Sequence, residues 1–246
     1  MQFGNREFRP RLWPTVATLI LLPILLRLGF WQLDRAEEKR EIQQRYTEQQ
    51  ARPAVELSLL DPTDEIEYRR ATVSGHFAAE RQILLDNQIH QKRAGYHVIT
   101  PLRIEDSQQY ILVNRGWVDG RLQRDTLPEF ETPEKTVTLT GQLKIPGGIG
   151  LKLGDRSYTD TDWPRVVQWL DIEELEKETG YKLYPYILQL DENEPHGFVR
   201  EWKIVSSEPE QSTSYAVQWF TLALALILIY IFVNTRKINH AKHEHK

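Results

Sequence analysis

The sequence predicts a membrane protein in which two transmembrane helices flank a β-rich domain of the α+β class. Residues 12–31 and 215–233 are both apolar, and each is close to the 20 or so residues that a helix needs to cross a bilayer. Residues 32–214 contain several segments in which apolar and polar residues alternate. Such alternation is typical of antiparallel strands with one buried face, so we expect a barrel or a sandwich.

The two apolar stretches have the marks of membrane spans. Arg27 is the only charge in the first span, one turn from its end, where a long cationic side chain can reach the headgroups. Trp13 and Trp31 bracket this span, Trp219 lies at the start of the second, and indoles favour the membrane interface. The first span is longer than the apolar core of a signal peptide and no cleavage site follows it, so we expect an uncleaved anchor.

The distribution of Lys and Arg predicts the orientation. Cations gather in the tails 1–11 and 234–246, at Arg6, Arg9, Arg11, Arg236, Lys237, Lys242 and Lys246. By the positive-inside rule both tails are cytoplasmic, which places the central domain in the periplasm of a bacterial inner membrane. A contrary cluster follows the first span, at Arg35, Lys39, Arg40 and Arg45. A long domain is translocated largely regardless of such charges, so the prediction stands.

The central domain begins as a helix and continues as strands. The first span is followed by strong helix formers up to Arg52-Pro53, so its helix should extend out of the membrane. Asp171 and Gly180 predict the two ends of a short helix, as N-cap and left-handed C-cap. The expected strands are 69–77, 81–87, 96–104, 109–118, 135–144 and 182–190, with a hairpin turn at Asp106-Ser107.

The composition excludes several kinds of chemistry. The chain has no cysteine, so disulfides, thiolate metal sites and cysteine nucleophiles are excluded. Its net charge is −4 without a basic stripe, which argues against nucleic acid as a partner. No hydrolase motif of the G-x-S-x-G, S-x-x-K or H-E-x-x-H type occurs. The histidines are scattered through the domain (His76, His90, His97 and His196) or lie in the C-terminal tail, so we expect no metal site.

Residues 145–162 are rich in glycine, but the spacing is not that of a phosphate-binding loop, and we interpret them as a surface loop. The segment L-V-N-R-G-W-V, residues 112–118, is more informative. Arg115 is costly to bury alone, so it should pair with a carboxylate or reach solvent or a ligand. Gly116 permits a bulge or a close backbone approach. The segment is therefore either a bulged strand end or a recognition surface.

A collar of polar and aromatic residues lies where both spans reach the outer interface. Trp31 and Gln32 leave the first span, and Tyr215, Gln218 and Trp219 enter the second. Ser212, Tyr215, Trp219 and Leu222 share one helical face. An aromatic belt accounts for Trp and Tyr, but a glutamine in a membrane helix usually bonds another helix or a ligand.

Four segments resemble the Surfeit-locus (Surf/Shy) family of cytochrome oxidase assembly proteins. They are F-W-Q-L-D-R-A-E-E-K, G-Y-H-V-I-T-P-L with I-L-V-N-R-G-W-V, W-P-R-V-V-Q-W-L-D, and S-Y-A-V-Q-W-F-T-L-A-L-A. The resemblance covers nearly the whole chain in the order that the family has. The matching positions are Trp31, Gln32, Arg35, Gly95, Tyr96, Pro101, Asn114, Arg115, Gly116, Trp117, Tyr215, Gln218 and Trp219.

The resemblance implies a non-enzymatic factor that acts while the catalytic subunit of a haem-copper oxidase matures. Its partners would be that subunit and haem A synthase, and its cofactor haem A. The haem site would comprise Trp31, Gln32, Tyr215, Gln218, Trp219 and a propionate-binding Arg115, while Arg35, Asn114, Gly116 and Trp117 would contact partners.

The chain departs from the family pattern at Ser212, where many members have the histidine proposed as the haem ligand. A hydroxyl is a poor iron ligand, which leaves Tyr215, one turn away, as a tyrosinate ligand. The alternatives are a scaffold that binds partners without haem, a membrane-tethered receptor, or a periplasmic enzyme. The short tails leave no room for a receptor's output module, and we find no catalytic group for an enzyme.

Overall fold

The computed structural model describes residues 2–3, 6–120, 131–146, 163–202, 204 and 208–237. The chain divides into two compact units, residues 1–44 with 204–246 and residues 45–203. Residues 147–162 of the loop predicted at 145–162 lie outside the described residues, as do the C-terminal histidines His240, His243 and His245.

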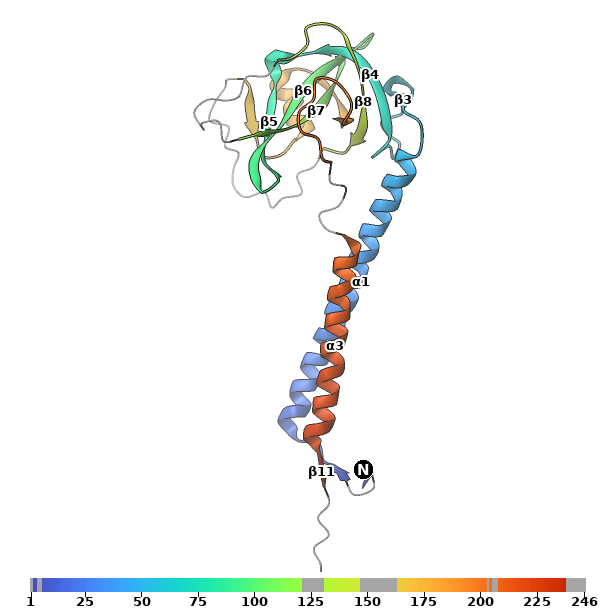
Figure 1. Ribbon diagram of the computed structural model, residues 1–246, viewed down its shortest axis with the longest axis vertical. Coiled ribbons are helices and arrows are strands. Elements are labelled where there is room, and N and C mark those ends of the chain that lie inside the picture. The colour runs from blue at the N-terminus through green and yellow to red at the C-terminus, as the bar shows by residue number, and fades with distance from the viewer. Residues whose placement is uncertain are drawn as a thin grey trace, which may run out of the picture. The chain divides into compact units, whose positions relative to one another are not determined.

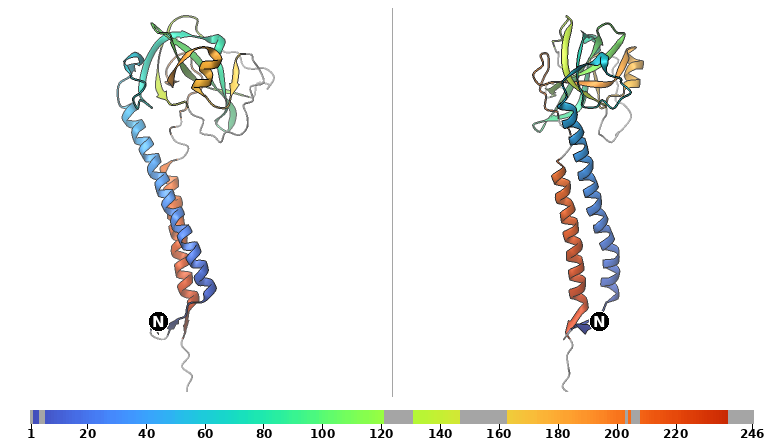
Figure 2. Two further views of the ribbon diagram at one scale, coloured as in Figure 1. Left: turned by 180° about the vertical axis from the view of Figure 1, so that it is seen from behind. Right: turned by 90° about the vertical axis from the view of Figure 1, so that its right-hand side faces the viewer.

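The first unit is built on two long helices that run side by side, α1 (Leu12–Gln50) and α3 (Pro209–Asn234) (Figure 2). Both are long and apolar enough to cross a membrane. Their ends are joined by short strands, because β2 (Arg6–Phe8) pairs antiparallel with β11 (Thr235–Lys237) and also with β1 (Gln2–Phe3). The α1 helix continues past its apolar part as predicted, and its last residues, from Arg45, belong to the second unit.

The second unit is a closed barrel of five strands (Figure 1). They are β4 (Arg70–Phe77), β6 (Arg93–Ile104), β7 (Gln109–Asp119), β8 (Val137–Lys144) and β10 (Lys182–Leu190). Around the barrel the order is β4-β6-β7-β10-β8 and back to β4; only β7 and β10 pair parallel. This is the Greek-key barrel arrangement of OB-folds.

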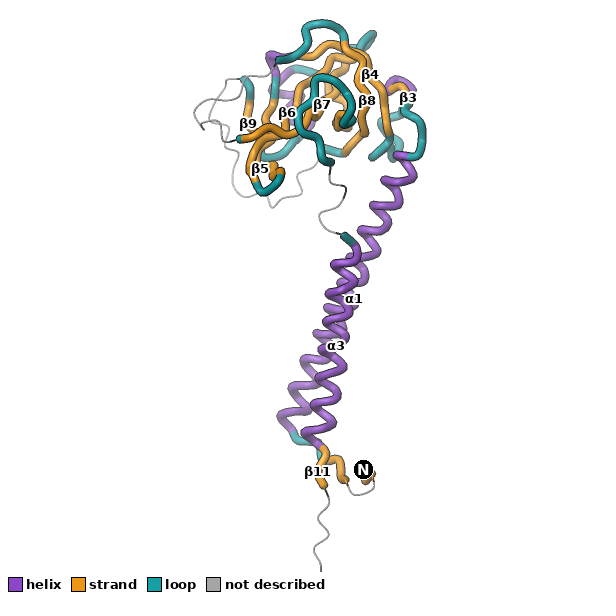
Figure 3. Tube along the Cα trace, in the orientation of Figure 1, coloured by secondary structure: helices purple, strands orange, loops and turns teal. Residues whose placement is uncertain are grey.

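Smaller elements complete the second unit. The strand β5 (Ile83–His90) pairs with β6, and β9 (Arg165–Val167) pairs with β5 (Figure 3). The helix α2 (Ile172–Thr179) lies between β9 and β10 in the chain. Short segments precede or follow β4, namely β3 (Val55–Glu56) and the 3-10 turns Leu57–Leu59 and Ala79–Arg81.

Two apolar cores hold the barrel together. The strand alternation predicted for 135–144 sends Leu139 and Leu143 into the first core, which they share with Leu102, Ile111 and Leu188 of other barrel strands. The second core joins Ile99 and Leu112 to Leu175 of α2 and Val167 of β9. A layer of β9 and α2 therefore covers one outer face of the barrel.

The local signals for α2 and for the β6–β7 hairpin are confirmed. Asp171 accepts a hydrogen bond from the Glu174 amide at 3.2 Å, and Gly180 ends the helix at φ 72°. Asp106 turns the hairpin with a positive φ of 56°. Both ends of α2 are thus set by residues that satisfy its free backbone groups or tolerate the left-handed conformation.

Candidate functional site

In the first unit, small residues let α1 and α3 approach closely. Gly29 and Ala36 of α1 and Ala216 and Ala223 of α3 are all buried. A Cβ atom at Gly29 would lie 2.6 Å from the ring of Phe220, so this ring occupies the space that glycine leaves. Small residues are the usual means by which membrane helices pack, because lipid gives no hydrophobic force between them.

Ser212 belongs to this helix contact rather than to an open site. Its side chain is buried, and its hydroxyl accepts a hydrogen bond of 2.9 Å from the Lys39 ammonium. One residue further along both helices, Arg40 donates to the Thr213 hydroxyl at 3.1 Å. These four residues form a polar clasp between α1 and α3. Lys39 lies seven positions after Gln32, on the same helical stripe, so the spacing along α1 is the signal in the sequence that indicates this contact.

The collar residues divide into two groups. Gln32 and Trp219 are partly buried, whereas Gln218 is exposed, as are Trp31 at 52% and Tyr215 at 45%. The residues of the predicted helical face therefore differ in burial. Ser212 is buried in the contact between α1 and α3, whereas Tyr215 and Leu222 are exposed. Neither glutamine amide makes a hydrogen bond within the described residues. The collar thus offers indole, phenol and amide groups that the helix pair itself does not use.

Arg35, the remaining motif residue on α1, is exposed. Its guanidinium forms an ion pair of 2.6 Å with Glu38, one turn further along the same helix. An exposed pair at this spacing contributes only a few tenths of a kcal/mol to helix stability. Arg35 is therefore accessible to a partner at little energetic cost.

In the second unit, the N-R-G-W segment forms a bulge in β7. The register shifts between the pairs His97–Trp117 and Ile99–Asn114, so two residues of β7 oppose one of β6. Gly116 takes a φ of 113°, and a Cβ atom there would lie 2.6 Å from the Val199 carbonyl. The Asn114 side-chain oxygen accepts the Gly116 amide at 3.1 Å and stabilises the bulge. The interpretation as a bulged strand end holds, for reasons that only glycine satisfies.

Arg115 is the buried residue of the bulge, only 2% exposed. Two of the expectations from the sequence are not met, because it has no carboxylate partner among the described residues and it does not reach solvent. Its Nε, Nη1 and Nη2 donate instead to the His196 carbonyl, the Thr132 hydroxyl and the Glu131 carbonyl, at 2.8, 3.0 and 2.9 Å. The faces of Phe77 and Phe198 lie 5.3 and 5.0 Å from the guanidinium carbon. Carbonyl dipoles and ring faces thus replace the missing anion.

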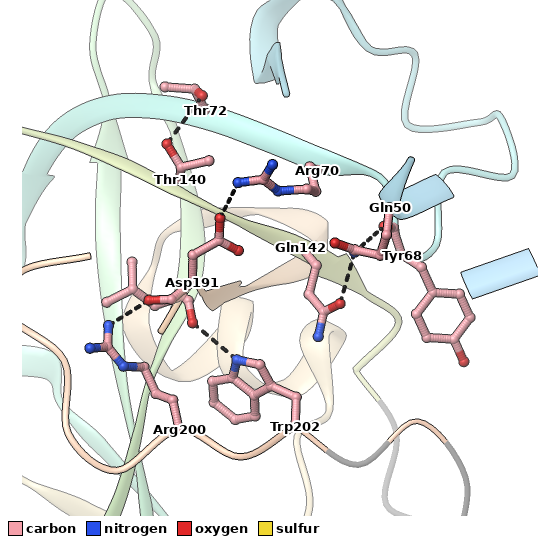
Figure 4. Close-up of polar contacts among 10 residues, drawn as sticks. Gln50, Tyr68, Arg70, Thr72, Thr140, Gln142, Asp191, Arg200 and Trp202 are labelled. Atoms are coloured by element: carbon pink, nitrogen blue, oxygen red, sulfur yellow. Dashed lines mark hydrogen bonds and ion pairs between the residues drawn. The ribbon is translucent and has the colours of Figure 1, made fainter. Parts of the chain in front are cut away.

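The bulge holds a strap, residues 198–202, against the barrel. Phe198 donates its amide to the Arg115 carbonyl at 2.6 Å, and Val199 pairs with Trp117 as an isolated bridge. The Arg200 guanidinium donates to the Asp191 carbonyl at 2.7 Å, and the Trp202 indole donates to the Leu190 carbonyl at 3.0 Å (Figure 4). Arg200 also donates to the carbonyls of Glu192 and Glu194. The motif therefore fixes the last part of the chain before it leaves the barrel unit.

Two histidines of the domain, His90 and His97, take part in its packing. His97 Nδ1 lies 3.2 Å from the Asn114 amide nitrogen, and its ring meets Trp202 edge-on at 5.5 Å. Burial lowers the pKa of His97 to about 4, so it is neutral at neutral pH. His90 lies beside Trp117 at 5.0 Å between ring centres, and His196 is an exposed turn residue. No group of three metal-binding side chains occurs in the part of the chain that the structure describes.

The remaining motif positions, Gly95, Tyr96 and Pro101, lie in β6. Gly95 and Pro101 are buried and Tyr96 is partly buried, so β6 uses them for packing.

Comparison with known sequences identifies the family of this chain. The sequence profile of the SURF1 family matches residues 19–224, which include most of both helices and the whole barrel unit. The chain belongs to the SURF1 family. A SURF1-like protein of Rickettsia bellii is 28% identical over 87% of this chain and 88% of its own. One from Caenorhabditis elegans is 24% identical, over 89% of this chain and 74% of its own.

The residues in the motifs of this SURF1 family member fall into two classes by their burial. Asn114, Arg115, Gly116 and Trp117 all have partners inside the barrel unit. Trp31, Tyr215 and Gln218 are exposed on the helix pair. Burial thus separates residues that the fold needs from residues that it leaves accessible.

Proposed function

We propose that this chain is a non-enzymatic assembly factor for a haem-copper cytochrome c oxidase. The observation that carries the proposal is the exposed collar of Trp31, Tyr215 and Gln218. These residues fall in segments that resemble the family's motifs, yet the fold does not need them. A binding surface for another membrane component explains their presence, since exposed aromatic and amide groups are well suited to partner contacts.

The partners that we propose are the maturing catalytic subunit of the oxidase and haem A synthase. The chain would lie in a bacterial inner membrane, with both tails in the cytoplasm and the barrel in the periplasm. The distribution of Lys and Arg supports this orientation. Both proposed partners are membrane proteins, so a collar on membrane helices can reach them.

An axial ligand for haem A on the helix pair would come from Tyr215. A phenolate is an established haem ligand, whereas the Ser212 hydroxyl is a weak one and already accepts a hydrogen bond from Lys39. Trp31, Gln32, Gln218 and Trp219 would then contact the macrocycle. Arg115 is left out of this site, because its three nitrogens already donate to groups of the barrel unit. Bound haem A would supply the cofactor that the oxidase subunit needs.

The test is to co-express the chain with haem A synthase, purify it in detergent and record its absorption spectrum together with extracted haem. A haem carrier should retain haem A near one per chain and lose most of it in Tyr215→Phe. The matched control is Tyr230→Phe, since Tyr230 lies near the other end of α3 and its hydroxyl meets Thr15 at 3.0 Å.

The same strains separate a carrier from a scaffold. If the chain holds no haem and still restores oxidase activity to a deletion strain, it acts as a scaffold and the haem role is wrong. If it restores no activity although it is folded and inserted, the assembly function itself is contradicted.

A further inference from the structure

The β5–β6 hairpin has a tip of unusual composition. Pairing continues to its end, with His90 opposite Arg93 and Ile89 opposite Ala94. The loop consists of Gln91 and Lys92 alone, both with positive φ, 46° and 65°. A two-residue loop of this kind is a type I′ turn, which strongly prefers Asn-Gly. Long side chains in this conformation are strained, so Gln91 and Lys92 occupy the turn at a conformational cost.

One face of the hairpin is fixed to the barrel. The Trp117 indole donates to the Gln88 carbonyl at 2.9 Å, and its ring lies beside His90. His90 Nδ1 lies 3.5 Å from the carboxylate of Glu201 in the strap. The strand β9 pairs with β5 only as far as Leu85, so within the described residues the rest of β5 has β6 as its one strand neighbour. Among the described residues, one face of the tip is therefore held by contacts with the barrel and the strap, and its other face has no such contact.

The open part combines apolar and cationic groups. Ile89 is 70% exposed, and Ala94 opposite it is exposed too. Between Asn87 and Gly95 the sequence has two cations, Lys92 and Arg93, and no carboxylate. Lys92 is exposed, and Arg93 is 52% exposed with only a 3.5 Å contact to Asp119. An apolar side chain flanked by cations is the composition of segments that bind the interface of anionic membranes.

The covalent structure links this hairpin to a membrane span. Glu201, which contacts His90, precedes Pro209 at the start of α3 by eight positions in the sequence. The hairpin is thus tied to the segment that leads directly into a helix apolar enough to cross a bilayer. A bilayer surface is always present for such a chain, and no second protein is needed to provide an anionic, partly apolar surface.

We propose that the tip of the β5–β6 hairpin is a membrane contact, in which Ile89 enters the headgroup region and Lys92 and Arg93 bind anionic lipid phosphates. This contact is distinct from the collar and does not depend on haem. It would give the barrel unit a second attachment to the membrane besides the helices. Each cation near an anionic surface should favour the attached state about fivefold.

The absence of cysteine from the chain makes a direct test possible. Ile89→Cys is labelled with the environment-sensitive dye NBD in the full-length protein, reconstituted in vesicles of phosphatidylcholine with a quarter phosphatidylglycerol. Leu59→Cys is the matched control, because Leu59 is 73% exposed in the same unit but lies beside Asp61. Both positions are exposed, so labelling should leave the fold intact.

We expect a blue-shifted emission at position 89, quenched by lipids that carry a nitroxide near the headgroup, and neither effect at position 59. Adding Lys92→Gln and Arg93→Gln should reduce the quenching, and vesicles of phosphatidylcholine alone should do the same. Equal, water-like emission at both positions in both lipids would overturn the proposal. A blue shift at 89 that appears only when purified oxidase is added would also overturn it, and would assign the tip to a protein partner.

Discussion

Arg115 is a cation that the barrel buries without an anion, and its three nitrogens donate to three different acceptors. Lysine keeps the charge but cannot place donors in a planar fork, so Arg115→Lys should lose at least two of these three hydrogen bonds. Each hydrogen bond lost from a buried cation costs about 1–3 kcal/mol. We expect the free energy of unfolding of the full chain in detergent to fall by about 2–5 kcal/mol, measured by denaturant titration with tryptophan fluorescence.

The control for Arg115 is Arg93→Lys, because Arg93 is 52% exposed and makes only a 3.5 Å ion-pair contact. This variant should change the unfolding free energy by less than about 0.5 kcal/mol. If the two variants had equal stability, Arg115 would not be a structural anchor, and the recognition role would regain support.

The lowered pKa of His97 predicts how the stability of the barrel depends on pH. Burial lowers its pKa to about 4, below the value of about 6.5 in an unfolded chain. The unfolded state therefore binds the proton more tightly, and the stability present above pH 6.5 is lost as the pH falls toward 4. The slope should approach 1.4 kcal/mol per pH unit, with a total of about 3 kcal/mol.

The measurement is the unfolding free energy of the full chain at several pH values, compared with His97→Gln. Glutamine can keep a hydrogen bond to Asn114 but does not titrate in this range. The variant should therefore have a flatter profile between pH 4 and 6.5. Parallel profiles would show that other groups cause the acid sensitivity.

At the scale of elements, the sequence predicted those whose signals are local. The strand predicted at 182–190 is found with the same bounds, and the caps of α2 agree with the structure because capping depends only on neighbouring residues. The strand predicted at 81–87 is found at Ile83–His90 instead. Asn87 has a positive φ at an irregularity of the pairing, which interrupts the alternation. The Gln91-Lys92 turn carries none of the usual turn residues, so this hairpin had no local signal.

The packing of α1 against α3 makes a prediction at Gly29. Its missing Cβ leaves room for the Phe220 ring, and Phe30 also meets that ring edge-on at 5.3 Å. Gly29→Leu should therefore force the helices apart. Ala17→Leu is the control, because Ala17 is exposed on the same helix. Cysteines at positions 15 and 230, where the native hydroxyls are 3.0 Å apart, allow the separation to be followed by crosslinking with a short thiol reagent.

We expect the yield of the crosslink to fall several-fold in Gly29→Leu and to stay unchanged in Ala17→Leu, because only the first adds volume at a buried helix contact. An unchanged yield in both variants would mean that Phe220 can move aside without separating the helices.

At the scale of the whole molecule, the sequence predicted two apolar helices around a β-rich domain, and barrel or sandwich remained open. The pairing of β4 with β6 closes the sheet into a barrel. It joins Gly75 to Ile104, which are far apart in the chain, and no local pattern encodes such a register. The candidate site shows the same limit. Residue types predicted a collar, but only burial separates Ser212, used in the helix contact, from Tyr215, which is left exposed.

The difference between buried and exposed motif residues predicts how variants should change the amounts of inserted protein and of mature oxidase in the cell. Gln218 is exposed and Trp219 partly buried, and neither makes a hydrogen bond within the described residues, so replacing both with alanine should leave the amount of inserted protein nearly unchanged. Mature oxidase should nevertheless fall several-fold, since the collar is the proposed contact.

Arg115→Lys should instead lower the amount of protein and oxidase together, because marginally stable chains are degraded. The control pair is Val217→Ala with Leu224→Ala, two exposed residues of the same helix. Immunoblots and oxidase activity in a complemented deletion strain measure both quantities, and normal oxidase in the Gln218 and Trp219 variant would remove these residues from the contact.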